Sequence, residues 1–294
     1  MLFEVNNINK SFGKNEVLKD VSFSLLPGTI TGIVGRNGSG KTTLLKILCG
    51  IYLADSGEFT LDKKKLSEDA KLISHIGFLP DRFDYFNYYK AKDVPEFYKI
   101  IYKNFDSDYF FCELNKNEID PNQTIRNFSK GQKNLLGLIT ILATKADIIL
   151  VDEVLDGMDV LNKKLILSYI LDAKDAGRTV LASSHDLDHL TGICEEILYL
   201  SKDGRLKNTS VDTKNIKKIQ IVVKDKLPKD LLDNSVLVSS LGRVNIILIN
   251  ASEDLLDHML ANDEIVQYDI LNLKIEDYFY MEQGGEIWKI LRKC

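Results

Sequence analysis

The chain has 294 residues, of which 45% are hydrophobic and 28% are charged, and its formal net charge is -5. This length suits one large domain, or one domain and a smaller one, and allows a sizeable core without disulfides or metals. The acidic balance disfavours nucleic acid as a partner, because nucleic-acid-binding domains are usually basic. Short lysine clusters at 63–65 and 214–218 are interpreted as solvated surface.

The cysteines and the apolar segments limit where the chain can work. Cys49, Cys112, Cys194 and Cys294 lack metal-ligand spacing, so we expect free thiols in a reducing compartment. The first residues lack a basic region followed by an apolar stretch, so no signal peptide is expected. The most apolar segment of the first two thirds, 135–143, is far shorter than the ~20 residues that span a bilayer. Any membrane role therefore requires a partner.

Periodicity predicts the elements in chain order. Apolar and polar residues alternate in two runs over 2–26, which predicts an antiparallel hairpin that turns at 13–15. An apolar strand at 29–34 and a helix at 41–49 follow, and Gly50 ends the helix. The remaining expectations are a strand at 74–79, a helical insertion at about 85–146, a strand at 148–151, a helix at 161–174, a strand at 179–183 and a hairpin over 197–206.

Beyond residue 207 the pattern changes to a small α+β domain. We therefore predict two domains, at 1–207 and 208–294. In the second domain, strands are expected at 216–224, 235–249 and 265–273, and helices at 227–232 and 253–260.

Between the strand at 29–34 and the helix at 41–49, the sequence GRNGSGKT fits the phosphate-loop pattern GxxxxGK[ST]. Glycines let backbone N–H groups face a phosphate, and the helix N-terminus adds the positive end of its dipole. Lys41 is expected to reach the terminal phosphates, and the Thr42 hydroxyl to bind Mg²⁺. The residues expected to contact the nucleotide are Gly35, Asn37, Gly38, Ser39, Gly40, Lys41, Thr42 and Thr43.

Two acids follow the buried strand at 148–151. Asp152 would face the nucleotide from the carboxyl end of this strand and hold Mg²⁺ through water, and Glu153 is the candidate general base. Such a pair is weak evidence alone, but downstream of a phosphate loop it favours NTP hydrolysis. The predicted fold is therefore α/β: a phosphate-loop NTPase core with a mostly parallel sheet, an N-terminal antiparallel β part, the helical insertion and the C-terminal α+β domain.

Residues 127–132 read NFSKGQ, which is similar to the LSGGQ segment of ABC-type ATPases. With GRNGSGKTTLLKIL before it and IILVDEVLDGMDV after it, the chain resembles this family from residue 1 to about 207. The resemblance implies that Phe12 stacks on adenine and that His185 contacts the γ-phosphate. It implies that residues 156–159 run across a dimer interface, and that ATP held by the opposite subunit is bound by Ser129, the Gly131 backbone and Gln132. These three residues lie at the start of a helix that we expect at 133–143.

Three positions depart from the pattern of this family. Lys130 replaces the first glycine of the LSGGQ-like segment, and Val154 stands where proline commonly follows the catalytic acid. Asp81 replaces the glutamine that senses Mg²⁺ and the attacking water. Its carboxylate can still bind Mg²⁺ and serve catalysis, although it adds negative charge near the γ-phosphate. Because no essential group is missing, we expect an active but slow enzyme.

The resemblance implies an ATP- and Mg²⁺-dependent ATPase subunit that powers a separate transmembrane permease. It would be cytoplasmic, peripheral on the cell membrane through the permease, and paired head-to-tail with a second ATPase subunit, identical or not. The aromatic segment 83–89 lies near the place where the family docks its membrane subunit, so we expect an exposed interface there, with packing inside the helical insertion as the alternative. Residues 275–280, IEDYFY, resemble the tail of ATPases from bacterial drug, bacteriocin and sodium exporters, which implies export.

Two alternatives belong to other functional classes. One is a non-transport ABC ATPase that acts on a ribosome or DNA complex, and the other is a module that holds ATP without hydrolysing it. A single cassette and the net negative charge disfavour the first alternative. The retained Glu153 and His185 disfavour the second.

Overall fold

The computed structural model describes residues 1–66, 68–185, 190, 192–208, 216–251, 256, 260–271 and 277. The chain divides into two compact units, Met1–Asn208 and Thr209–Cys294. Among the described residues, no helix has both the length and the apolar composition needed to cross a membrane. The helix expected at 253–260 and the tail at 275–280 lie largely outside the described residues.

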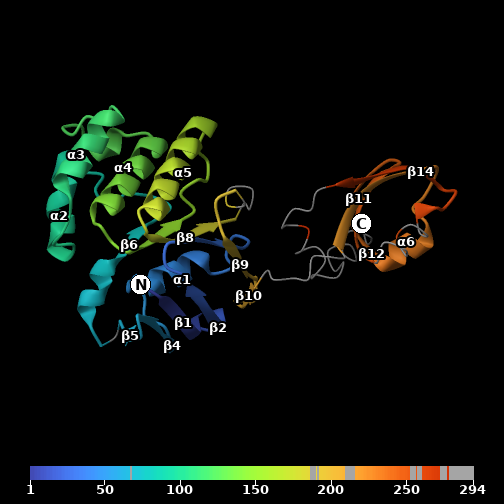
Figure 1. Ribbon diagram of the computed structural model, residues 1–294, viewed down its shortest axis with the longest axis horizontal. Helices are drawn as coiled ribbons and strands as arrows, with labels where there is room; N and C mark the ends of the chain where they lie inside the picture. The colour runs from blue at the N-terminus through green and yellow to red at the C-terminus, as the bar shows by residue number, and fades with distance from the viewer. Residues whose placement is uncertain are drawn as a thin grey trace. The chain divides into compact units, whose positions relative to one another are not determined.

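A six-stranded sheet forms the centre of the first unit (Figure 1). Its strand order is β10-β9-β3-β8-β7-β6, and the strands are parallel except β10, which pairs antiparallel with β9. The inner strands are apolar and buried on both faces, as parallel strands covered by helices must be. The strands are β3 (Ile30–Val34), β6 (Ile76–Leu79), β7 (Ile148–Asp152), β8 (Thr179–Ser184), β9 (Glu196–Leu200) and β10 (Leu206–Asn208).

A second, antiparallel sheet has the order β2-β1-β4-β5. The predicted hairpin is confirmed as β1 (Phe3–Phe12) and β2 (Asn15–Leu25). The sequence did not predict β4 (Ser56–Leu61) or β5 (Lys64–Lys65), because the first half of β4 is exposed and contains Gly57. β4 forms by pairing with β1, where Phe3 lies opposite Leu61.

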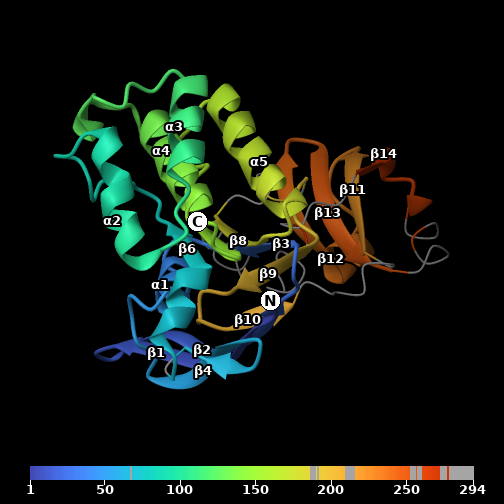
Figure 2. The same cartoon turned by 60° about the vertical axis from the view of Figure 1, so that its left-hand side comes forward.

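Helices cover both faces of the parallel sheet (Figure 2). α1 lies between the two sheets and buries Leu44, Leu45 and Leu48 in a core shared by both. α4 and α5 pack on the opposite face, and α2 and α3 complete the predicted helical insertion. The helices are α1 (Lys41–Leu48), α2 (Val94–Ile101), α3 (Ser107–Lys116), α4 (Lys130–Ala143) and α5 (Val160–Asp175), with 3₁₀ turns η1 (Ala70–His75), η2 (Ala91–Asp93) and η3 (Ile125–Asn127).

Two predicted boundaries were wrong. The helix expected from residue 133 begins at Lys130, because Ser129 and Gln132 form a capping box that allows an earlier start. The strand expected from residue 74 begins at Ile76, because the preceding residues form η1, which Asp69 caps.

The second unit contains a four-stranded antiparallel sheet of order β12-β13-β11-β14. One face of this sheet packs Ile219, Ile221 and Ile247 against Leu231 of its helix. The strand expected over 235–249 is two strands joined by a tight turn at Gly242, whose φ is 59°. The elements are β11 (Ile216–Val223), α6 (Lys229–Asn234), β12 (Ser235–Leu241), β13 (Val244–Asn250) and β14 (Ile265–Leu271).

Candidate active site

The phosphate loop connects β3 to α1, as the sequence predicted. At Gly35, a Cβ would lie 2.4 Å from the carbonyl oxygen of Leu200, so a larger residue would displace the backbone. Gly40 caps α1 with a φ of 105°, a conformation that only glycine adopts readily. The loop is therefore held close to β9 and directs the N-terminus of α1 toward its open side.

The loop opens on a cavity of about 410 Å³, within the range of small-molecule sites. Phe12 borders it from the β1–β2 hairpin, and Glu153 borders it from the carboxyl end of β7. Phe12 is 47% exposed, its ring meets Tyr52 edge-on, and Lys10 Nζ lies over the ring, 5.3 Å from its centroid. The cavity is lined by Phe12, Val17, Asn37, Gly38, Gly40, Lys41, Thr42, Thr43 and Glu153.

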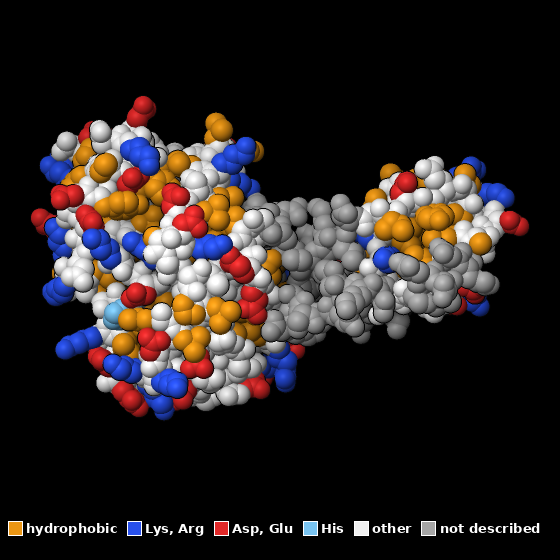
Figure 3. Space-filling model, in the orientation of Figure 1, with side chains coloured by type: hydrophobic (Ala, Val, Ile, Leu, Met, Phe, Trp, Pro, Cys, Tyr) orange, Lys and Arg blue, Asp and Glu red, His pale blue; other side chains and the backbone are white. Residues whose placement is uncertain are grey.

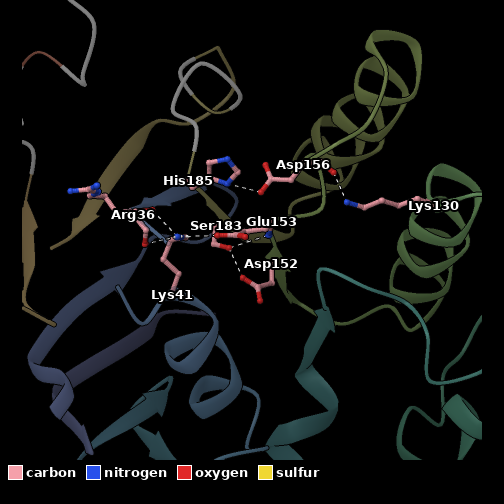
Figure 4. Close-up of polar contacts among 9 residues, drawn as sticks. Arg36, Lys41, Lys130, Asp152, Glu153, Asp156, Ser183 and His185 are labelled. Atoms are coloured by element: carbon pink, nitrogen blue, oxygen red, sulfur yellow. Dashed lines mark hydrogen bonds and ion pairs between the residues drawn. The ribbon is translucent and has the colours of Figure 1, made fainter. Parts of the chain in front are cut away.

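Lys41 is almost fully buried at the floor of this cavity (Figure 4). Its Nζ donates to the carbonyl oxygens of Gly35, at 2.6 Å, and Arg36, at 3.3 Å. The same Nζ lies 2.9 Å from Oε1 of Glu153. The lysine expected to hold phosphate and the acid expected to activate water are thus in direct contact.

Glu153 adopts an unusual backbone conformation, with a φ of 44°. Its N–H donates to the backbone oxygen of Ser183 at 3.2 Å and contacts Ser183 Oγ at 3.1 Å. Non-glycine residues in this region of φ store strain and persist only where their surroundings hold them. β8 therefore fixes the direction in which the Glu153 side chain leaves β7.

Asp152 is fully buried below the phosphate loop. Burial raises the pKa of its carboxyl group above the ordinary value, and the negative charges of Glu153 and Asp81 raise the pKa further. Hydrogen bonds from the Ser183 and Thr42 hydroxyls lower the pKa but do not cancel this increase. Oδ1 accepts from Ser183 Oγ at 2.6 Å, whereas buried Oδ2 accepts no hydrogen bond within the described residues. A buried carboxylate oxygen beside a threonine hydroxyl is the all-oxygen donor set that Mg²⁺ prefers, so these residues fit that ion.

His185 follows β8 and contacts Asp156 through Nδ1 and Oδ2, which are 2.7 Å apart (Figure 4). Ligand atoms of Glu153, Asp156 and His185 all lie within 4.8 Å of one another. The histidine that the resemblance implies for the γ-phosphate therefore lies beside the candidate base, on the same edge of the sheet.

The LSGGQ-like segment lies at the start of α4. Ser129 caps this helix: its hydroxyl accepts from the Gln132 N–H at 3.2 Å, and Gln132 Oε1 accepts from the Ser129 N–H at 3.0 Å. A Cβ on Gly131 would lie 3.0 Å from Asn162 of α5, so this position has little room for a side chain. None of these three residues lines the phosphate-loop cavity of the described chain.

Asp81 follows β6 and lies apart from the phosphate loop. It lines a separate cavity of about 250 Å³ with Lys130 and Lys133. Its charge nevertheless contributes to the raised pKa of Asp152. Asp81 is thus near enough to influence the expected metal site, while the structure does not place it in the phosphate-loop cavity.

Sequence reasoning missed Ser183 and the contact between Asp156 and His185. Ser183 bonds both Asp152 and Glu153, since it lies beside Asp152 in the parallel pairing of β7 with β8. The sequence places Ser183 two residues before His185 at a strand end, but only the strand order reveals which strand lies next to it.

The aromatic segment 83–89 was expected to be exposed, and this expectation was wrong for its two phenylalanines. Phe83 is 1% exposed, and Phe86 packs against Phe97 with ring centroids 5.2 Å apart. Tyr85 and Tyr88 are exposed. An apolar groove of about 370 Å³ adjoins this cluster and is lined by Cys49, Ile51, Ile73, Ile76, Phe78, Phe86, Phe97, Tyr98, Ile101, Tyr102 and Ile141.

The fold and the site define a phosphate-loop NTPase cassette, and comparisons with known proteins identify its family. The profile of the family described as ABC transporter matches residues 18–156. The uncharacterized ABC transporter ATP-binding protein MJ1023 of Methanocaldococcus jannaschii is 31% identical over 207 residues, covering 68% of this chain and 74% of that one. The ABC transporter ATP-binding protein YtrB of Bacillus subtilis (strain 168) is 28% identical over 291 residues, covering 97% and 99%.

Solved structures agree at the level of the fold. The ATP-binding subunit of an ABC transporter matches with a TM-score of 0.65 at 20% identity, covering 73% of this chain and 91% of that one. The dimeric bacterial ABC transporter cassette MJ0796 matches with a TM-score of 0.62 at 24% identity, covering 71% and 99%. The chain therefore belongs to the ATP-binding proteins of ABC transporters, which are ATPases coupled to transport.

Proposed function

We propose that this chain hydrolyses ATP to power a separate transmembrane permease, at the cytoplasmic face of the cell membrane, in the direction of export. The observation that supports this best is the single cavity bordered by the phosphate loop, Phe12 and Glu153. A candidate base, an aromatic ring and a phosphate loop all face this cavity. Such a cavity suits a nucleoside triphosphate whose terminal phosphate is attacked by water.

Nucleotide binding rests on the loop and on α1. The adenine stacks on Phe12, while backbone N–H groups from Gly38 to Thr43 surround the β- and γ-phosphates. Lys41 leaves Glu153 and contacts the terminal phosphates. It thereby exchanges a carboxylate, which carries one negative charge, for an anion that carries several.

Mg²⁺ would be held by the Thr42 hydroxyl and by Asp152, directly or through water, with Asp81 as a further candidate ligand. When bound, the ion neutralises charge that develops on the β- and γ-phosphate oxygens. Ser183 orients the Asp152 carboxylate through its hydrogen bond to Oδ1, so Oδ2 would be available to bind the ion.

Hydrolysis requires Glu153 to act on water. Once Lys41 has moved to the phosphates, the freed carboxylate accepts a proton from the attacking water. His185, beside it, contacts the γ-phosphate and holds it for attack. The strained φ of Glu153 and its two contacts to Ser183 keep the base fixed in this position.

The active form is a head-to-tail dimer with an identical or a different cassette. Ser129, the Gly131 backbone and Gln132 are presented at the N-terminus of α4, where N–H groups and the helix dipole favour an anion. Each subunit would close the nucleotide site of its partner with this segment.

The permease would dock in the apolar groove between α2 and the end of α1. The groove is bordered by exposed apolar residues, of which Ile51 is 54% and Ile101 is 51% exposed. Hydrophobic side chains are also visible over the helical insertion in Figure 3. Exposed apolar surface of this kind commonly marks an interaction site.

The direction of transport is inferred from the C-terminal sequence. The resemblance of residues 275–280 to drug, bacteriocin and sodium exporter ATPases supports export. Some relatives are named as import proteins, such as the ribose import ATP-binding protein RbsA of Bacillus subtilis (strain 168), which is 27% identical over 252 residues. The match to RbsA covers 79% of this chain and 49% of RbsA. The match to YtrB covers 99% of YtrB, and the name of YtrB states no direction of transport.

The proposal is tested by affinity purification of the tagged chain from detergent-solubilised membranes, with mass spectrometry of the proteins that co-purify. We expect one polytopic membrane protein in a stoichiometric amount. Recovery with ribosomal proteins or DNA-bound proteins in place of a membrane protein would support the non-transport alternative and overturn the proposal.

A further inference from the structure

Lys130 makes a contact that a glycine at this position could not make. Its Nζ donates to the backbone oxygen of Asp156 at 2.6 Å (Figure 4). A second residue of α4 holds the same turn, because buried Asn134 donates to the oxygen of Val154 at 3.0 Å. The first two turns of α4 thus hold residues 154–156 at two backbone carbonyl groups.

The same turn reaches the nucleotide side of the subunit. The Asp156 N–H donates to the oxygen of Glu153 at 3.2 Å, which places the turn directly after the candidate base. The Asp156 side chain contacts His185 at 2.7 Å. Asp156 therefore connects Lys130 of α4, through its backbone, with His185, through its side chain, and ligand atoms of Asp156 and His185 lie within 4.8 Å of Glu153.

Lys130 also has a defined place in these contacts. Gly157 adopts a φ of 66°, and a Cβ there would lie 3.3 Å from Lys130 Nζ. The absence of a side chain at Gly157 leaves room for the ammonium group against the turn.

We propose that Lys130 is a positioning residue that links the two nucleotide sites of the dimer. Lys130 lies between Ser129 and Gly131, so it moves whenever these residues engage the ATP of the partner subunit. Its contact with Asp156 passes that movement to His185 in its own subunit. The inference rests on the head-to-tail arrangement in the proposed function, and its consequence is that ATP at one site favours ATP at the other.

Binding of a fluorescent ATP analogue with Mg²⁺ to the Glu153→Gln protein tests this link without turnover. We expect a Hill coefficient above 1 for binding of the analogue. Coupling of this kind typically changes the affinity of the second site by about 5–150-fold. Adding Lys130→Met should reduce the Hill coefficient to 1, whereas Lys130→Arg, which can still donate to a carbonyl oxygen, should retain part of it. Lys133→Met is the matched control, because Lys133 contacts Asp84 and Asn87 and not the turn.

A second readout does not depend on nucleotide. In histidine side-chain NMR, Lys130→Met should shift the resonance of His185 and leave that of His75 unchanged. Equal Hill coefficients with and without Lys130→Met, or a coefficient of 1 before the substitution, would overturn the inference. A variant that binds ATP weakly at every site would instead indicate direct phosphate contact by Lys130, which also contradicts it. Failure of the Glu153→Gln protein to bind ATP at all would reject the proposed function itself.

Discussion

The ammonium group of Lys41 lies 2.9 Å from a carboxylate oxygen of Glu153, so the two residues with the most prominent roles in the site form an ion pair. Lys41 is buried and Glu153 is partly exposed. In the proposed mechanism, a triphosphate that enters the cavity competes with Glu153 for Lys41 and so frees the carboxylate for its proposed role as base.

Replacing Glu153 by Gln removes both the base and the competing charge. Hydrolysis should fall by about 10²–10⁴-fold, the usual contribution of a positioned base. ATP affinity should rise, because Lys41 no longer has an anionic partner in the chain. With ATP and Mg²⁺, the protein should accumulate as a dimer, which light scattering measures.

Adding Ser129→Arg provides the control for this prediction, because a bulky cation at the α4 N-terminus blocks the contact in trans. The double variant should bind ATP and remain monomeric. A Glu153→Gln protein that is saturated with ATP yet monomeric would count against the head-to-tail dimer. A dimer that persists without nucleotide would indicate that residues 208–294 mediate dimerisation.

Lys41→Ala should lower both ATP affinity and hydrolysis while the fold remains intact. The variant loses a charge-assisted contact to phosphate, and Leu44, Leu45 and Leu48 still anchor α1 in the core. Lys46→Ala on the same helix is the matched control, because Lys46 lies over the Tyr52 ring and does not line the cavity. Circular dichroism and an ATPase assay measure the two effects. Wild-type hydrolysis by Lys41→Ala would mean that the phosphate loop has been misinterpreted.

The apolar groove predicts different effects for its exposed and its packed residues. Ile101→Glu places a charge on exposed docking surface, so it should reduce co-purification of the membrane partner with little change in thermal stability. Phe86→Ala should instead lower stability, because Phe86 packs against Phe83, Phe97 and Tyr98. Pull-down from solubilised membranes and thermal unfolding separate these outcomes. Normal recovery of the partner by Ile101→Glu would remove this groove as the docking site.

The second unit contains a buried ion pair between Lys218 and Asp277. Lys218 Nζ lies 2.9 Å from Oδ1 of Asp277, and the side chains are 13% and 2% exposed. Lys218→Ala leaves a buried carboxylate without this cation, so we expect the free energy of unfolding to fall by about 3–5 kcal/mol. Combining it with Asp277→Leu should restore much of the loss, measured by urea unfolding. Equal stability of Lys218→Ala and the wild type would show that the pair is unimportant.

The sequence determined those features that depend on neighbouring residues. The phosphate loop, the hairpin, the strand that ends in Asp152 and Glu153, and the capping residues of α4 are all local patterns. Their geometry follows from glycine conformations, side-chain periodicity and hydrogen bonds between nearby residues. For this reason the α/β phosphate-loop fold was predicted and is confirmed, while the roles assigned to the site residues remain predictions.

Only the tertiary structure decided which distant segments meet. β4 exists because it pairs with β1, and Ser183 serves Asp152 because β8 lies beside β7. The packing of Phe86 against Phe97 of α2 depends in the same way on how the insertion folds back. Lys130 was visible in the sequence only as a missing glycine, and its contact with Asp156 required α4 to pack against the turn after β7. Such contacts are set by strand order and helix packing, which one-dimensional periodicity does not specify.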